Sequence, residues 1–242
     1  MRYVTLLFAC ALGTVNAFMS VSSPRLRDAH MLHMVAGRVT SLKPAASPLL
    51  NSGKAIARSG ELLIDLTTTL DLYGGGLSSA GATIRNAGDH IAQAAASCRF
   101  KTGTELVCDE IRESATCLLE ASQEHFKKAL TEAVADKDVT LETGIGAVIP
   151  ILENAGTSLE AAGAGILQRA SIEDVGYKIS ECGEYLGMFA GAILNLAKDE
   201  EEAQIASQRM QFASEQMIEA GNELSGNQKV PEKKTGKGWI KG

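Results

Sequence analysis

The amino-acid sequence predicts an all-α protein, a five- or six-helix antiparallel bundle whose helices meet along Ala/Gly-rich heptad seams. The first indication is a seven-residue repeat, in which a large apolar residue is followed three positions later by two small residues. The second is the composition, because 45% of the residues are hydrophobic but only 5% are aromatic. A core of Leu, Ile, Ala and Gly suits closely packed helices better than a sheet.

The repeat places its large and small residues on one stripe of an α-helix, since its steps alternate between three and four residues. Weaker copies begin at Ile111, Ile179 and Met217. The three strong copies are Leu49-x-x-Ser52-Gly53-x-x-Ile56-x-x-Ser59-Gly60-x-x-Leu63, Leu77-x-x-Ala80-Gly81-x-x-Ile84-x-x-Ala87-Gly88-x-x-Ile91 and Leu152-x-x-Ala155-Gly156-x-x-Leu159-x-x-Ala162-Gly163-x-x-Ile166.

The glycines of the strong copies need a physical reason, because a glycine inside a helix costs about 1 kcal/mol relative to alanine. Small residues on a seam let two helices come closer than the usual spacing of about 8–10 Å. The predicted close-packing positions are Gly53, Gly60, Gly81, Gly88, Gly156 and Gly163.

Caps and breakers set the expected helix ends in the first half of the body. Ser47-Pro48 suits an N-cap followed by the first helical position, so the body is expected to begin at residue 48. Gly74-Gly75-Gly76 is expected to end or bend this first helix. Thr102-Gly103-Thr104-Glu105 has the form of a capping box that opens the third segment.

The second half of the body, up to residue 225, is divided in the same way. Residues 136–140 are polar enough for a turn, and Pro150 either kinks a long helix or marks a new start. Ser171-x-x-Asp174 and Asp199-x-x-Glu202 are expected to cap the last two helices. Short connections make neighbouring helices antiparallel, each about 20 to 30 residues long.

Residues 1–17 have the organisation of a secretory signal peptide. Arg2 supplies the positive charge, residues 4–15 form the apolar stretch, and Val15-Asn16-Ala17 is a small-residue cleavage site. Residues 18–47 are basic and contain several Ser but only one acid, Asp28, which is typical of an organellar transit peptide.

The two segments together, with Phe18 directly after the expected cut, resemble the bipartite plastid presequence of diatoms and other heterokont algae. The junction Ala17-Phe18 keeps the Ala-Phe core of that family but lacks a Pro shortly after the Phe. The resemblance implies import into a complex plastid. The stroma is favoured over the thylakoid lumen because no second apolar targeting segment precedes Ser47. Secretion is the alternative.

Residues 226–242 form a basic tail that is expected to be disordered, since it is rich in Gly, Lys and Pro. It holds the single Trp of the chain, Trp239, next to Ile240 and among lysines. Trp239 and Ile240 could dock on an acidic, grooved partner or touch a membrane surface. A solubilising tail with an incidental aromatic residue is the simpler interpretation.

Four cysteines remain after the expected removal of Cys10. Cys98 and Cys108 flank the connection between the second and third helices, so they could form a disulfide. The alternative is that the thiols are free and fill small buried positions. No Cys or His spacing suggests a zinc site, and no metal or cofactor is predicted.

No catalytic set is predicted either. His90 is expected beside the seam and His125 close to a seam position, with no partner signature for a nucleophile and base. The net charge of −6 argues against nucleic acid as a partner. No apolar run of the expected mature chain reaches the roughly 20 residues of a membrane span.

The leading hypothesis is therefore a non-enzymatic plastid protein that acts by protein–protein interaction, as a scaffold or accessory subunit. A secreted or membrane-active bundle is the second hypothesis. The third is an enzyme or ligand carrier with a pocket between helices. Identity of the partner and oligomeric state are not encoded in these patterns.

Overall fold

The computed structural model describes residues 42–70, 75–99, 104–136 and 139–226, and in these residues the protein is the predicted all-α bundle. Most of the expected presequence, up to residue 41, and the tail from residue 227 lie outside the described residues. The helices are η1 (Lys43–Ala45), α2 (Ala46–Thr69), α3 (Gly76–Arg99), α4 (Thr104–Glu120), η2 (Ala121–Phe126), α5 (Lys127–Asp136), α6 (Val139–Gln168), α7 (Ile172–Leu196) and α8 (Glu201–Ser225).

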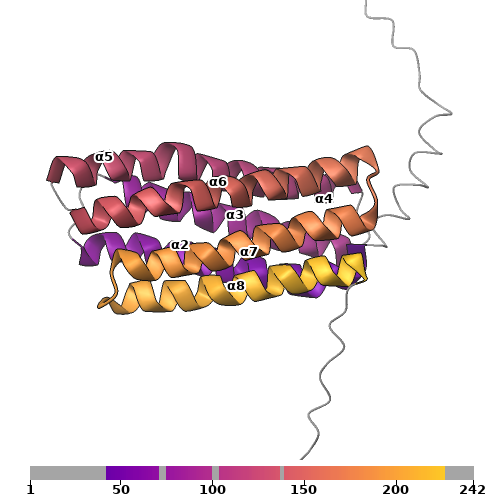
Figure 1. The fold of residues 1–242 in the computed structure, drawn as a ribbon. Coiled ribbons are helices and arrows are strands. Elements are labelled where there is room, and N and C mark those ends of the chain that lie inside the picture. The colour runs from indigo at the N-terminus through magenta and orange to yellow at the C-terminus, as the bar shows by residue number, and fades with distance from the viewer. Residues whose placement is uncertain (1–41, 71–74, 100–103, 137–138, 227–242) are drawn as a thin grey trace, which may run out of the picture.

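The described helices form a closed ring of antiparallel rods (Figure 1). α4, η2 and α5 follow one another without a break and act as one rod. Each rod contacts the rods before and after it in the chain, and α8 packs on α2 to close the ring. The ring therefore consists of three hairpins, α2–α3, α4–α6 and α7–α8.

The heptad explains how each rod meets both of its neighbours. The large residue, such as Ile56 in α2, is fully buried in the interior. The first small residue faces one neighbour and the second faces the other. In α2, Ser52 donates a hydrogen bond to a carbonyl of α8, whereas Gly53 lies against the backbone of α3.

Apolar side chains cross the interior between rods that are not adjacent. Phe126 of η2 and Phe189 of α7 are fully buried, and their rings meet edge to face with centroids 6.2 Å apart. Among the described residues, every buried side-chain nitrogen or oxygen has a hydrogen-bond partner. No described helix combines the length and the apolarity that crossing a bilayer requires.

A π-helical turn, η2, interrupts the heptad of the third rod. The spacing Ile111, Leu118 would next place His125 in the interior. The wider turn adds one residue, so Phe126 is buried instead and the rod continues with Ala129 and Ala133 on its inner side. The expected position of His125 near the seam is thereby displaced toward the surface.

The structure changes two of the predicted boundaries and decides between the alternatives at Pro150. The bundle begins before Ser47-Pro48, because Leu42 and Ala45-Ala46 add one more buried heptad ahead of Leu49. Part of the expected transit segment is thus helical and packed. Pro150 lies inside the single helix α6. Ser171 caps α7 as predicted, accepting from the Asp174 amide, but the residue before α8 is Glu200 without a side-chain cap.

Candidate functional site

The predicted close-packing glycines of the first hairpin lie where two helix backbones touch. A methyl carbon added at Gly60 would lie 2.5 Å from the Arg85 nitrogen and from the Gly81 oxygen. One added at Gly53 would lie 2.6 Å from the Ala92 nitrogen and the Gly88 oxygen. Since the obstructing atoms belong to backbone, no side chain there can make room.

The glycines predicted in α6 meet side chains instead. At Gly156 the nearest atom to an added methyl carbon is the Leu119 Cγ at 2.8 Å, and at Gly163 it is the Arg112 Cγ at 2.7 Å. The third hairpin has backbone contacts of the first kind, formed by Gly176, Gly183 and Gly221. These three were not predicted as sites, although their register in the weak repeats marks them.

Hydroxyl groups hold the interfaces between hairpins. Ser52 and Ser59 of α2 each donate to a carbonyl oxygen of α8, at 3.0 Å, and Ser114 of α4 donates to the Ala87 oxygen of α3 at 2.9 Å. A buried hydroxyl that donates to a helix carbonyl satisfies its own polarity. The seams therefore account for the small residues as structure, without a reactive group.

The four cysteines of the described residues are free thiols, so the expected Cys98–Cys108 disulfide is absent and the alternative holds. The Cys108 thiol points across to α6, where it donates to the Gly163 oxygen at 3.1 Å. Burial raises the pKa of Cys98 to about 11 and that of Cys182 to about 12. Thiols with such pKa values are poor nucleophiles near neutral pH.

The histidines pair with carboxylates on the outside of the ring. The His90 Nδ1 lies 2.8 Å from the Glu110 Oε2, which links α3 to α4, and the His125 Nε2 lies 3.3 Å from the Glu120 Oε1. Within the described part of the chain, no three His, Cys, Asp or Glu side chains are grouped to hold a metal ion. Trp239 and Ile240 lie outside the described residues.

An open groove with a volume of about 1120 Å³ lies between α6 and α7. Its floor is shallow because small residues face outward on both helices, and Gly191 has no neighbouring atom where a methyl group would stand. Met188 is 57% exposed at its edge. Its α6 and α7 lining includes Leu141, Gly144, Ala147, Ile151, Met188, Gly191, Ala192 and Leu196.

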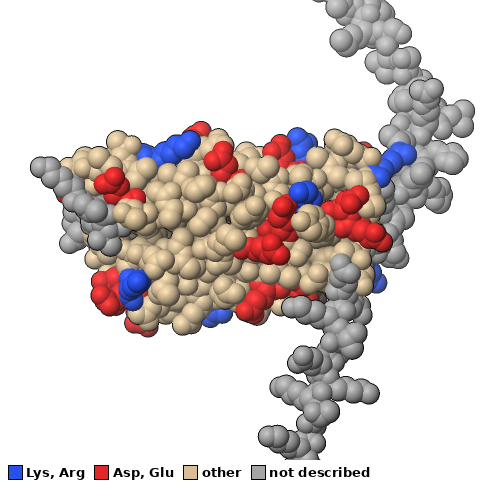
Figure 2. All heavy atoms as spheres, viewed as in Figure 1, with Lys and Arg blue, Asp and Glu red and all other residues tan. Residues whose placement is uncertain are grey.

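The same furrow between α6 and α7 is polar at its other end. There Ser158 of α6 donates to the Glu181 carboxylate of α7 at 3.0 Å, and Lys178 lies 2.8 Å from the same oxygen. The hydrogen bond between Lys178 and Glu181 lowers the pKa of the Glu181 carboxyl and raises the pKa of the Lys178 amine. Figure 2 shows clustered acids over this end of the face, and a stretch of uncharged surface between them and the charged residues of the opposite end.

Sequence reasoning missed this groove. The available signal was a set of glycines outside the seam register, at positions 144, 187 and 191. Such glycines carry the helix penalty, and Gly191 does so without any contact that an added methyl group would disturb. No protein-family model, curated protein or solved structure matches the chain.

Proposed function

We propose that this protein acts by binding another protein, as a scaffold or accessory subunit without catalysis of its own, and that the partner docks in the α6–α7 groove. The observation that carries the proposal is a hollow whose α6 and α7 lining is uncharged and mostly small or apolar, with the exposed Met188 at its edge. Concave apolar surfaces of this kind accept an apolar helix face or an aromatic anchor.

The geometry of the groove favours a helical or extended segment as the docking element. The hollow follows the α6–α7 furrow from Ile151 and Met188 to the start of α8, where Lys198, Asp199 and Glu200 supply polar groups at the rim. An apolar centre with a polar rim is the usual anatomy of an interaction surface.

The test is affinity capture with the full chain from an extract of the source organism. We expect Met188→Glu to lose a partner that the parent chain retains, because a carboxylate would be desolvated in the groove. The matched control is Leu167→Glu, since Leu167 is 55% exposed at the opposite end of α6. A partner retained equally by both variants, or turnover of a substrate by the purified chain alone, would contradict the proposal.

We propose that the protein acts in a complex plastid. The resemblance of residues 1–47 to a bipartite presequence supports this localisation. A fluorescent protein fused after Pro48 is expected to reach the plastid, and Phe18→Ala is expected to divert it. Delivery of the unaltered fusion to the medium or endomembranes would favour the secreted alternative.

A further inference from the structure

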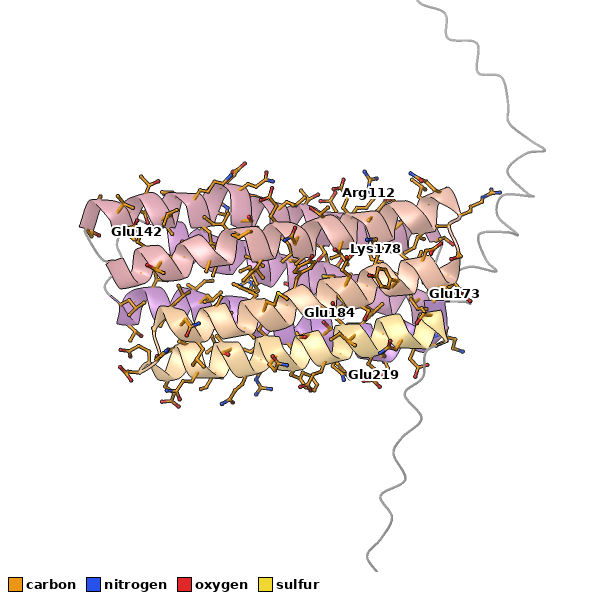
Figure 3. All side chains as sticks on the ribbon, in the orientation of Figure 1. Arg112, Glu142, Glu173, Lys178, Glu184 and Glu219 are labelled. Atoms are coloured by element: carbon orange, nitrogen blue, oxygen red, sulfur yellow. The ribbon has the colours of Figure 1, made fainter. Side chains whose placement is uncertain are left out.

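The exposed face of α6, α7 and α8 has an acidic end near the C-terminus of α8, whereas its other end holds the groove with its apolar centre and carries Glu142 of α6 (Figure 3). The acidic end carries Glu173, Glu184 and Glu219 on α7 and α8. Lys178 lies among them, but its charge is paired with Glu181 at 2.8 Å. A ligand that lies along this face from the end of α8 therefore meets these carboxylates first and the apolar centre of the groove beyond them.

The tail of the same chain has the complementary order of charge and apolarity. Residues 227–242 contain five lysines and one glutamate, and Trp239-Ile240 follows most of these lysines. Lysines placed before an apolar pair match an acidic surface that leads to an apolar hollow.

The starting point and the length of the tail also allow it to reach the groove. α8 ends at Ser225 and is capped by Gly226 in the left-handed conformation, at the acidic end of the face. Gly187 lies against Ser214, so the Met188 edge of the groove is level with that part of α8. From Ser214 to Ser225 a helix rises about 17 Å. Residues 227–238 span up to about 40 Å when extended, which is more than is needed to reach the Met188 end of the groove.

We infer that Trp239 and Ile240 occupy the α6–α7 groove of their own chain, with the tail lysines on the acidic end of the face. The inference rests on the proposed function, because it adds a regulatory step at the same groove. The tail holds the groove in the free protein, and a partner must displace it. Removal of the tail then raises the apparent affinity for the partner, since a competing intramolecular segment is lost.

Trp239 makes a direct test possible, because it is the only Trp of the chain. In the full chain we expect its emission maximum at a shorter wavelength than in denaturant, with a several-fold smaller acrylamide quenching constant. Met188→Glu on α7 and Ala147→Glu on α6 should each restore an exposed spectrum. Leu167→Glu is the control and should leave the docked spectrum unchanged, with circular dichroism verifying the fold of all three.

The outcomes separate this inference from the proposed function. An exposed Trp239 in the parent chain overturns the inference, as does a buried Trp239 that neither groove variant exposes. A docked spectrum that disappears on dilution also overturns it, since a second copy would then supply the tail. Partner capture that still depends on Met188 while Trp239 is exposed would keep the proposed function and reject only the tail. A docked Trp239 without any Met188-dependent partner would keep the inference about the tail and reject the proposed function.

Discussion

The first and second hairpins use the same large-small-small repeat but achieve different kinds of contact. In α2–α3 both helices contribute glycines, and each would place an added methyl carbon against backbone of the partner helix. In α4–α6 only α6 contributes glycines, and they face Leu119 and Arg112 side chains. The repeat therefore determines which positions must be small. The atoms of the partner helix determine whether a residue larger than glycine is tolerated there.

The largest expected effect is that of a single added methyl group in the first hairpin. Gly60→Ala gains about 1 kcal/mol of helix propensity, but its methyl carbon would lie 2.5 Å from two backbone atoms. Separating the helices costs packing along the whole seam, so we expect a net loss of about 2–3 kcal/mol in the free energy of unfolding. Urea denaturation measures it. A variant as stable as the parent would show that the backbones are not in contact.

A substitution in the α2–α8 interface, which joins two hairpins, should have an effect of intermediate size on the free energy of unfolding. Ser52→Ala removes the hydrogen bond to the Ala213 oxygen of α8, at 3.0 Å, without leaving a buried donor unpaired. We expect a loss of about 1 kcal/mol, the usual contribution of one buried hydrogen bond. Alanine already occupies the same register position in α3 and α6. A loss of stability larger than that of Gly60→Ala would contradict the expected order of effects.

The second hairpin should tolerate the same change better. Gly156→Ala places a methyl carbon 2.8 Å from the Leu119 Cγ, and Leu119 is only partly buried, so its side chain can move. The gain in propensity offsets much of the strain, and we expect a net change below about 1 kcal/mol.

A double-mutant cycle makes this difference specific to Leu119. Leu119→Ala should relieve the strain of Gly156→Ala, with a coupling of about 1 kcal/mol. Gly146→Ala is the control in the same helix, because nothing lies within 4 Å of its added methyl carbon, and it should gain about 1 kcal/mol. Additive effects at 119 and 156 would refute the side-chain account.

The smallest expected effect concerns the π-helical turn, which among the described residues occurs only in the second hairpin. Deleting Gln123 removes the extra residue, so Phe126 returns to the heptad position that now falls on His125. We expect a regular α-helix whose stability stays within about 1 kcal/mol of the parent, because the Phe126–Phe189 contact is kept. Cooperative unfolding in urea reports it, and a loss as large as that of Gly60→Ala would show that the turn itself is required.

Much of the fold was predictable from sequence because a heptad with small pairs identifies helix, inner face and seam together. The order of rods around the ring was not, since the pattern does not say which neighbour each small residue meets. His125 fitted the heptad, so the register shift was missed, although Phe126, Ala129 and Ala133 continue the new register.

The heptad pattern could not predict the candidate groove either, because it does not say which helices are neighbours. The groove arises from small residues on two helices that only the fold brings together, Gly144 and Ala147 with Gly191 and Ala192. The free state of Cys98 and Cys108 could not be predicted from their spacing either, because it depends on the direction of the Cys108 thiol, which points to α6.

The most direct test of the seam account is one urea-denaturation series in which Gly53, Gly60, Gly81, Gly88, Gly156, Gly163 and Gly146 are each changed to alanine. The account predicts losses at the four α2–α3 positions that exceed those at Gly156 and Gly163 by roughly 1–2 kcal/mol, and a gain at Gly146. Equal changes at all seven positions would contradict the claim that backbone contact sets the need for glycine.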